Sequence, residues 1–95
     1  MSSRIFSEGK HIIDFTATWC GPCKRIAPLF NELKKENSDI YFHKVDVDDE
    51  EEIARKHKVE SLPTFIGIVN GKEVERFEGA NNDRLRKMVE RLNKM

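Results

Sequence analysis

The sequence predicts an α/β fold in which helices flank a central mixed sheet of four strands, in the order β-α-β-α-β-β-α. Four short segments rich in β-branched and aromatic residues alternate with segments whose apolar residues recur at helical spacing. The first three elements form a βαβ unit, which requires parallel strands and a right-handed crossover. Asn70-Gly71 predicts a hairpin between strands at residues 64–69 and 72–77. A length of 95 residues suits a single domain, residues 1–95.

The βαβ unit occupies the first half of the sequence. Its first strand is predicted at residues 12–16, where a largely apolar segment is interrupted by the carboxylic acid Asp14. A helix follows from Cys23, and Pro28 lies inside it, where a proline should introduce a kink. The second strand is predicted at residues 40–46.

Two further helices are predicted from their apolar spacing and cap residues. Asp49, with Glu52 three residues later, resembles a capping box and predicts a short helix from there to about Lys58. The last helix should begin near Asn82, a good cap residue, and should bury one apolar face. That face consists of Leu85, Met88, Val89 and Leu92.

Charge and composition argue against several classes of partner. The chain has 17 basic and 17 acidic residues, so it lacks the basic surplus that nucleic-acid binding requires. No basic block suggests binding to an anionic membrane surface, and no apolar stretch is long enough to cross a bilayer. The N-terminal residues lack the apolar run of a secretory signal. We therefore expect a cytoplasmic protein that binds neither nucleic acid nor membranes.

The chemistry is expected at the Cys-x-x-Cys motif formed by Cys20 and Cys23. A structural zinc site needs four ligands, whereas the chain has one such pair and three histidines without ligand spacing, so no metal is expected. A pair at the strand-to-helix junction of a βαβ unit is instead typical of a redox motif. Two reduced cysteines that serve only packing are the alternative reading.

The two thiols should have unequal roles. Cys20 falls near a helix N-terminus, where unpaired N–H groups favour a thiolate, the form that attacks disulfides. Gly21 and Pro22 form a tight first turn, and Cys23 follows one turn later. Cys23 is expected to be more buried and to act as the resolving thiol. The three histidines are expected to be solvated surface residues.

The residues from Phe15 to Lys24, FTATWCGPCK, resemble the active-site stretch of the thioredoxin family, in particular its eukaryotic cytosolic type. The resemblance continues through five shorter segments. They are Ile26-Ala27-Pro28, Lys44-Val45-Asp46-Val47-Asp48, Leu62-Pro63-Thr64-Phe65, Asn70-Gly71 and Phe77-Glu78-Gly79-Ala80-Asn81. It implies the thioredoxin fold and a protein-disulfide reductase that works by dithiol–disulfide exchange. It also implies disulfide-containing target proteins, no bound cofactor, and recharging by thioredoxin reductase, which uses NADPH.

The resemblance assigns supporting roles around the two cysteines. Burial should raise the pKa of Asp14, and the family residue at this place exchanges a proton with the resolving cysteine. Lys44 matches a lysine near that aspartate, although a satisfied buried ion pair is the alternative for both residues. Pro63 matches a cis proline that packs against the disulfide. The backbone of Leu62 would then pair with an extended substrate segment.

The same resemblance predicts a surface for substrate docking. Trp19 should be partly exposed beside the nucleophile, with Gly21 and Pro22 next to it. Gly79 and Ala80 match the loop that completes this surface. Gly79 has a second explanation, because a glycine is also favoured where the backbone needs a positive φ.

The N-terminus is shorter than in most members of this family. Ile5 and Phe6, followed by residues 7–9, are predicted to be the last turn of a first helix closed by Gly9. The strand at residues 40–46 would then lie at a sheet edge. We expect a monomer, with a weak dimer through this edge as a hypothesis. An isomerase or oxidase of different redox poise, or a non-catalytic binding module, are the other functional readings.

Overall fold

The computed structural model describes residues 7–95 of the chain. These residues form four strands and three helices in the predicted order β-α-β-α-β-β-α. The elements are β1 (Lys10–Thr16), α1 (Gly21–Glu36), β2 (Ile40–Asp46), α2 (Glu51–Lys56), β3 (Thr64–Val69), β4 (Lys72–Glu78) and α3 (Asn82–Asn93). The predicted fold class is therefore confirmed, and each predicted strand lies within two residues of an observed one.

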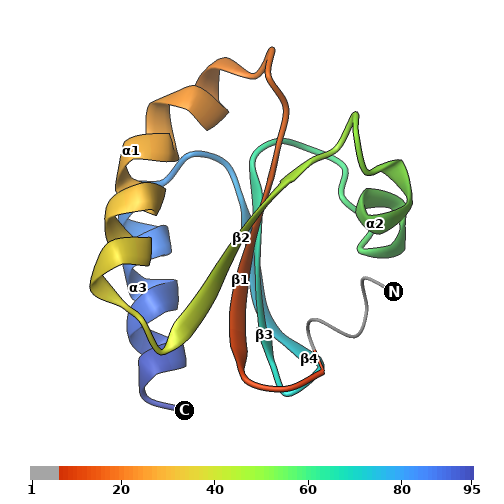
Figure 1. The fold of residues 1–95 in the computed structure, drawn as a ribbon. Coiled ribbons are helices and arrows are strands. Elements are labelled where there is room, and N and C mark those ends of the chain that lie inside the picture. Colours follow the sequence, from red (N-terminus) through yellow and green to blue (C-terminus); the bar gives the residue numbers. More distant parts are fainter. Residues whose placement is uncertain (1–6) are drawn as a thin grey trace.

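The four strands form one mixed sheet in the order β2-β1-β3-β4. β1 and β2 are parallel, as the βαβ unit requires, and their register places Asp14 beside Lys44. β3 is antiparallel to both β1 and β4. Helices α1 and α3 cover one face of the sheet and α2 covers the other (Figure 1). Within residues 7–95, β2 lies at an edge of the sheet, as predicted.

The alternation of side chains along β1 explains why this central strand is buried on both faces. Ile12 belongs to the apolar cluster under α1 and α3, whereas Ile13 and Phe15 belong to the cluster under α2. Because side chains alternate with a period of two, Asp14 points to the same face as Ile12. The fold therefore carries this carboxyl into the space beneath α1.

The predicted hairpin turn is present at Asn70 and Gly71. Both residues have positive φ angles, 49° and 84°, as a two-residue turn that matches the twist of the strands requires. Asn70 also fixes the start of β1, because its backbone N–H donates to the Gly9 carbonyl and its side chain accepts from the Gly9 N–H, both at 2.9 Å.

The predicted turn of helix before β1 is not found where the chain is described. Residues 7–9 form a bend, and Gly9 has a φ of 85°. Ile5 and Phe6 lie outside the described residues. Among residues 7–95, no helix combines the length and the hydropathy that a membrane span needs.

The capping box predicted at Asp49 is wrong. Helix α2 begins at Glu51, its cap residue is Glu50, and no side chain caps it. The backbone N–H groups of Asp49 and Glu50 instead donate to the carbonyl of Asp46, at 3.1 and 2.9 Å. A turn that follows β2 directly therefore uses these donors, and the helix starts after it. The helix also ends earlier than expected, at Lys56 rather than at about Lys58.

The histidine prediction is also wrong, because His11 is only 2% exposed. Its Nδ1 lies 2.9 Å from Nε2 of His43 on the neighbouring strand, and its Nε2 lies 2.7 Å from the carbonyl oxygen of Glu8. The register that pairs β1 with β2 brings the two rings onto one face, where the His11 ring stacks with both His43 and Tyr41. The spacing of histidines along the chain does not reveal this pairing.

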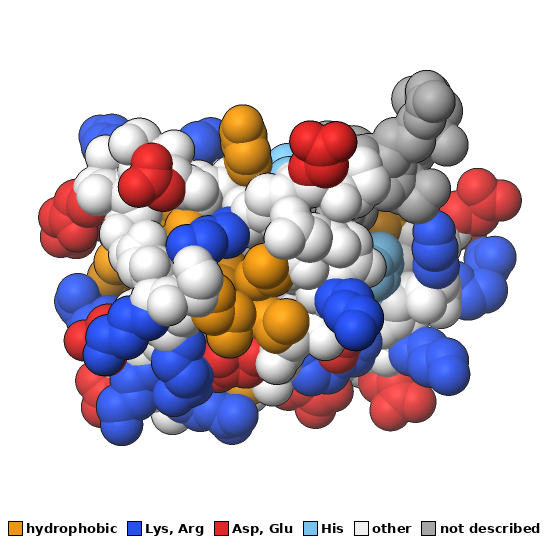
Figure 2. Space-filling model, turned by 90° about the horizontal axis from the view of Figure 1, so that it is seen from below, with side chains coloured by type: hydrophobic (Ala, Val, Ile, Leu, Met, Phe, Trp, Pro, Cys, Tyr) orange, Lys and Arg blue, Asp and Glu red, His pale blue; other side chains and the backbone are white. Residues whose placement is uncertain are grey.

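Figure 2 shows the molecule from below relative to Figure 1. In this view, basic side chains gather on the side of α1 and α3. The last turns of these helices carry Lys34, Lys35 and Arg91. Cations at helix C-termini complement the negative end of the helix dipole, so this charge distribution stabilises both helices.

The last helix begins at Asn82, as predicted, but Asn81 is its cap residue. The Asn81 side chain accepts a hydrogen bond from the backbone N–H of Arg84 at 3.0 Å. We expect Asn81→Ala to lower the free energy of unfolding by about 1 kcal/mol, because that N–H loses its acceptor. Asn82→Ala is the matched control and should change stability much less. Urea denaturation of both variants measures the two effects. If Asn82→Ala were more destabilising than Asn81→Ala, Asn81 would not be the cap residue.

Candidate active site

The two cysteines lie at the junction between β1 and α1. Cys20 is the cap residue of α1, and it forms a disulfide with Cys23, with 5.3 Å between the Cα atoms. The Cys20 sulfur also accepts a hydrogen bond from the backbone N–H of Cys23 at 3.1 Å. Gly21 and Pro22 form the first turn of the helix between them. The N-terminal end of a helix thus faces the sulfur of Cys20, and it favours negative charge on that atom.

The two cysteines do not differ in burial in the way we predicted. Cys20 is 4% exposed and Cys23 is 3% exposed, so burial alone does not distinguish an attacking thiol from a resolving one. What differs is the space that each one borders. Cys20 lines a cavity of about 430 Å³, and Cys23 lines a separate cavity of about 360 Å³.

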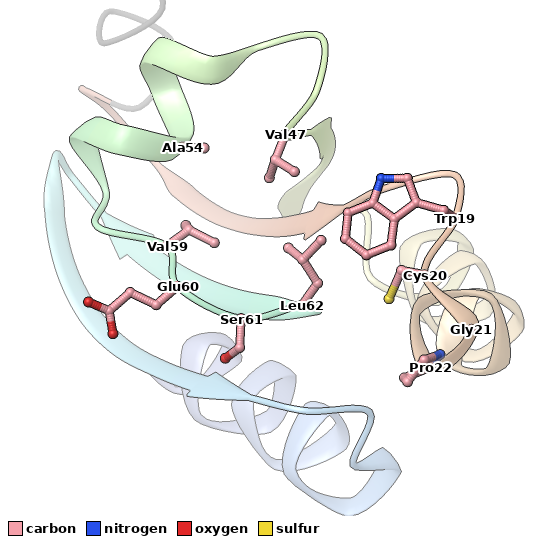
Figure 3. A pocket seen from close by; sticks show the side chains of 10 residues that line it. All are labelled: Trp19, Cys20, Gly21, Pro22, Val47, Ala54, Val59, Glu60, Ser61 and Leu62. Atoms are coloured by element: carbon pink, nitrogen blue, oxygen red, sulfur yellow. The ribbon is translucent and has the colours of Figure 1, made fainter.

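The cavity beside Cys20 is largely apolar, and we refer to it as the outer cavity. The side chains of Trp19 and Leu62 line it next to the Cys20 sulfur, and Val47 lies near them (Figure 3). Trp19 is 68% exposed, and its indole N–H donates to Oδ2 of Asp48 at 2.8 Å. An exposed indole held by a hydrogen bond can contact a polypeptide without losing much side-chain freedom.

Pro63 lies directly before β3 and follows Leu62, which lines the outer cavity. The peptide bond that joins Leu62 to Pro63 is cis. The carbonyl of Pro63 accepts a hydrogen bond from the backbone N–H of Gly79 at 2.9 Å. Gly79 has a φ of 99°, a conformation that favours glycine. The loop of Gly79 and Ala80 is therefore held against the residues that precede β3.

The cavity beside Cys23, which we call the inner cavity, contains Asp14. This carboxyl is 1% exposed, and its Oδ1 has no hydrogen-bond partner within residues 7–95. Burial raises the pKa of Asp14 to about 7, although the positive charge of Lys44 acts in the opposite direction. Lys44 lines the same cavity. A carboxyl with a pKa near 7 can take up and release a proton at neutral pH.

A family model described as thioredoxin matches residues 2–91. The chain belongs to the thioredoxin family. The curated relative "Thioredoxin H2-2" of Oryza sativa subsp. japonica is 50% identical over 78 residues, which cover 82% of this chain and 58% of that protein. "Thioredoxin-1" of Caenorhabditis elegans is 51% identical over 78 residues, covering 82% of this chain and 68% of its own length. The chain thus spans less than two thirds of the first of these relatives.

The solved structures agree with the family assignment. The structure of Plasmodium falciparum thioredoxin superimposes with a TM-score of 0.91 at 42% sequence identity, covering 95% of this chain and 89% of that one. The predicted thioredoxin fold is therefore confirmed. Within residues 7–95, no group of three or more His, Cys, Asp or Glu side chains is placed to hold a metal ion.

The structure brings most of the predicted residues of this thioredoxin-family site together in two places. Seven residues proposed for docking lie around the outer cavity or in the adjoining loop. They are Trp19, Gly21, Pro22, Leu62, Pro63, Gly79 and Ala80. Asp14 and Lys44 lie apart from these, in the inner cavity with Cys23. The disulfide separates the two groups.

Sequence reasoning missed Asp48, the hydrogen-bond partner of Trp19. A signal for it exists, because β1 and β2 are parallel and their carboxyl ends meet at one edge of the sheet. Trp19 follows β1 by three residues, and Asp48 follows β2 by two. Glu60, which also lines the outer cavity, offers no such signal, because it lies in an irregular segment before β3.

The charge of Lys44 should limit how far burial raises the pKa of Asp14 in this thioredoxin-family site. We expect Lys44→Met to move that pKa above about 7, because the variant removes the positive charge that opposes the effect of burial. An NMR titration of the Asp14 carboxyl carbon measures the shift directly. Lys24→Met is the control, since Lys24 lines the same cavity and should influence Asp14 less. If Lys44→Met left the pKa of Asp14 unchanged, the charge of Lys44 would have no influence on that carboxyl.

Proposed function

We propose that this chain is a protein-disulfide reductase whose active centre is the Cys20–Cys23 pair. The observation that carries the proposal is the position of the disulfide. It lies at the first turn of a helix, with Cys20 on an open apolar cavity and Cys23 on an inner cavity that contains a buried carboxyl. The membership of the thioredoxin family supports the same reaction class.

In the first step, the thiolate of reduced Cys20 attacks one sulfur of a target disulfide. A bond forms between that sulfur and the Cys20 sulfur, and the target disulfide breaks. The other target sulfur leaves as a thiolate and takes a proton from solvent. The helix N-terminus that faces Cys20 stabilises the attacking thiolate, which raises its population near neutral pH.

In the second step, Cys23 resolves the mixed disulfide. Its thiol gives its proton to the carboxylate of Asp14, which lines the same cavity. The resulting thiolate attacks the Cys20 sulfur and forms the Cys20–Cys23 disulfide. The mixed disulfide breaks, and the second target sulfur leaves as a thiolate that takes a proton from solvent. Two electrons have then passed from the cysteine pair to the target. Lys44, which opposes the effect of burial on Asp14, would set the pH range of this transfer.

The oxidised pair must receive two electrons before another cycle. We propose that thioredoxin reductase supplies them from NADPH, so that this chain needs no bound cofactor. Target proteins would dock against Trp19 and the Gly79–Ala80 loop, and an extended segment would lie along the backbone at Leu62. We further propose that residues 1–95 form one domain, act as a monomer and work in the cytoplasm.

The coupled reduction of insulin tests the proposed function. The purified chain is mixed with insulin, thioredoxin reductase and NADPH, and NADPH consumption is followed together with precipitation of the freed insulin chains. We expect turnover that depends on the chain. A chain that is itself reduced by dithiothreitol but transfers no electrons to insulin would overturn the proposal. Equilibration with glutathione gives the reduction potential, which separates a reductase from an isomerase or oxidase.

A further inference from the structure

A third cavity lies between α1 and the loop that leads into α3. It has a volume of about 210 Å³ and is lined by Arg25 and Ile26 from α1, Ala80, and Asn82 from the start of α3. We refer to it as the Arg25 cavity. Arg25 contributes the charged side chain of this lining, and Asn82 contributes an amide that can donate or accept a hydrogen bond. None of these residues takes part in the exchange steps described above.

The Arg25 cavity and the outer cavity adjoin the same stretch of helix. Gly21 and Pro22 line the outer cavity, and Arg25 follows them by four and three residues. Residues at these spacings are neighbours on one face of a helix. All three are exposed, so a polypeptide that contacts the first turn of α1 next to Cys20 also meets the Arg25 side chain.

The loop before α3 connects the Arg25 cavity to the docking residues. Ala80 lines this cavity, and its neighbour Gly79 donates a hydrogen bond to the carbonyl of Pro63. Pro63 follows Leu62, which lines the outer cavity. Each of the two cavities is therefore bounded by a segment on which the proposed function already places the target.

The charged side chains at the Arg25 cavity and at the outer cavity differ in sign. Arg25 forms no ion pair with the side chains of residues 7–95, so its guanidinium is available to a ligand. Asp83 follows Asn82 in sequence but does not line the Arg25 cavity. By contrast, Glu60 lines the outer cavity, and Asp48 accepts the hydrogen bond of the Trp19 indole there. An acidic side chain of a docked segment would be attracted to the Arg25 cavity and repelled from the outer cavity.

We propose that Arg25 is a specificity-determining residue that favours target segments with an acidic side chain near the reactive disulfide. The side chain of Arg25 and the amide of Asn82 would receive the carboxylate, while the target cysteine reaches Cys20. This inference rests on the proposed function and names the class of target that the same site prefers. It concerns the choice of target, since the bonds formed and broken remain those described above.

The test uses short peptides that contain one disulfide and differ at one position. One pair carries Glu or Gln two residues before the reactive cysteine, and a second pair carries Glu or Gln two residues after it. We measure kcat/KM for each peptide with the wild-type chain and with Arg25→Met, Arg25→Glu and Lys35→Met. Lys35 is the control, because it is an exposed cation near the far end of the same helix. Insulin serves as the common reference substrate.

At least one Glu peptide should be reduced faster than its Gln counterpart by about 1.5- to 5-fold, the range for one exposed pair of opposite charges. This advantage should disappear in Arg25→Met, turn into a disadvantage in Arg25→Glu, and persist in Lys35→Met. It should also shrink at high ionic strength.

Three results would overturn the inference. They are the absence of any preference for Glu, a preference that survives in Arg25→Met, and an equal loss of the preference in Lys35→Met. Reduction of insulin at the normal rate alongside any of these results would leave the proposed function intact. A wild-type chain that reduces neither insulin nor any peptide would instead remove the proposed function and, with it, this inference.

Discussion

Cys20→Ser is expected to abolish insulin reduction, leaving no turnover above that of a reaction without the chain. A serine hydroxyl cannot supply a thiolate at neutral pH, so no mixed disulfide can form and Cys23 has nothing to resolve. The measurement is NADPH consumption in the coupled assay. Because Cys20 caps α1, the far-UV circular dichroism and the urea midpoint of the variant must be recorded to exclude unfolding.

Cys23→Ser separates the roles of the two cysteines. Cys20 can still attack a target, but no second thiolate releases it, so the mixed disulfide should accumulate. Non-reducing gel electrophoresis with a target protein should show a covalent adduct that dithiothreitol removes. Adducts formed by Cys20→Ser and not by Cys23→Ser would reverse the proposed roles. Adducts are the informative readout, because the two cysteines are almost equally buried.

The buried carboxyl of Asp14 should make the stability of the protein fall as pH rises from about 4 to about 7. The folded chain keeps the proton up to about pH 7, whereas the unfolded chain releases it near the ordinary value of 3.8. Between these values the unfolded state binds fewer protons, so the free energy of unfolding decreases as pH rises. A shift of this size corresponds to a loss of roughly 4 kcal/mol, complete above about pH 7.

Asp14→Asn removes the titration and should make the stability profile flatter over the same pH range. The quantity to compare is the difference in free energy of unfolding between variant and wild type, measured with urea at several pH values on the oxidised form. This difference should grow in favour of the variant as pH rises from 4 to 7. Its absolute value is less informative, because the buried amide adds an offset that does not depend on pH.

Asp39→Asn provides the matched control for this experiment. Asp39 is an exposed carboxylate in the turn before β2, and its replacement removes one negative charge without altering the buried site. Its profile should run parallel to that of the wild type. If the Asp14→Asn profile were also parallel, folding would not raise the pKa of this carboxyl. The carboxylate would then be too weak a base at neutral pH to take the proton of Cys23.

Features that depend on neighbours in sequence were predicted correctly. The four strands, the parallel βαβ unit and the hairpin at Asn70-Gly71 follow from apolar spacing and from the backbone preferences of short segments. The placement of Cys20 and Cys23 at a strand-to-helix junction follows from the same local patterns. Local patterns were less reliable at helix ends, where Asp49 and Asn82 were chosen as caps, but Glu50 and Asn81 take these positions.

Cap positions fail for a physical reason. A side-chain cap needs a free backbone N–H with a side-chain acceptor nearby, and a turn directly before the helix can take the same donors. The carbonyl of Asp46 takes the N–H groups of Asp49 and Glu50, so the helix begins later than the local signal indicates. The residues 49–52 alone do not show that β2 ends at Asp46, close enough for its carbonyl to take these donors.

The sequence by itself determined the position of the cysteine pair, the order of the elements and the family, because each depends on patterns of residues that are close together along the chain. Only the tertiary structure decided the surroundings of that pair. It paired His11 with His43, joined Asp14 and Cys23 in one cavity, and placed Arg25 beside Ala80 and Asn82. These contacts join residues of different helices, strands and loops, and burial and charge at such contacts depend on packing. The disulfide is therefore a local property of this chain, whereas the pKa of Asp14 and the proposed preference for acidic targets depend on the fold.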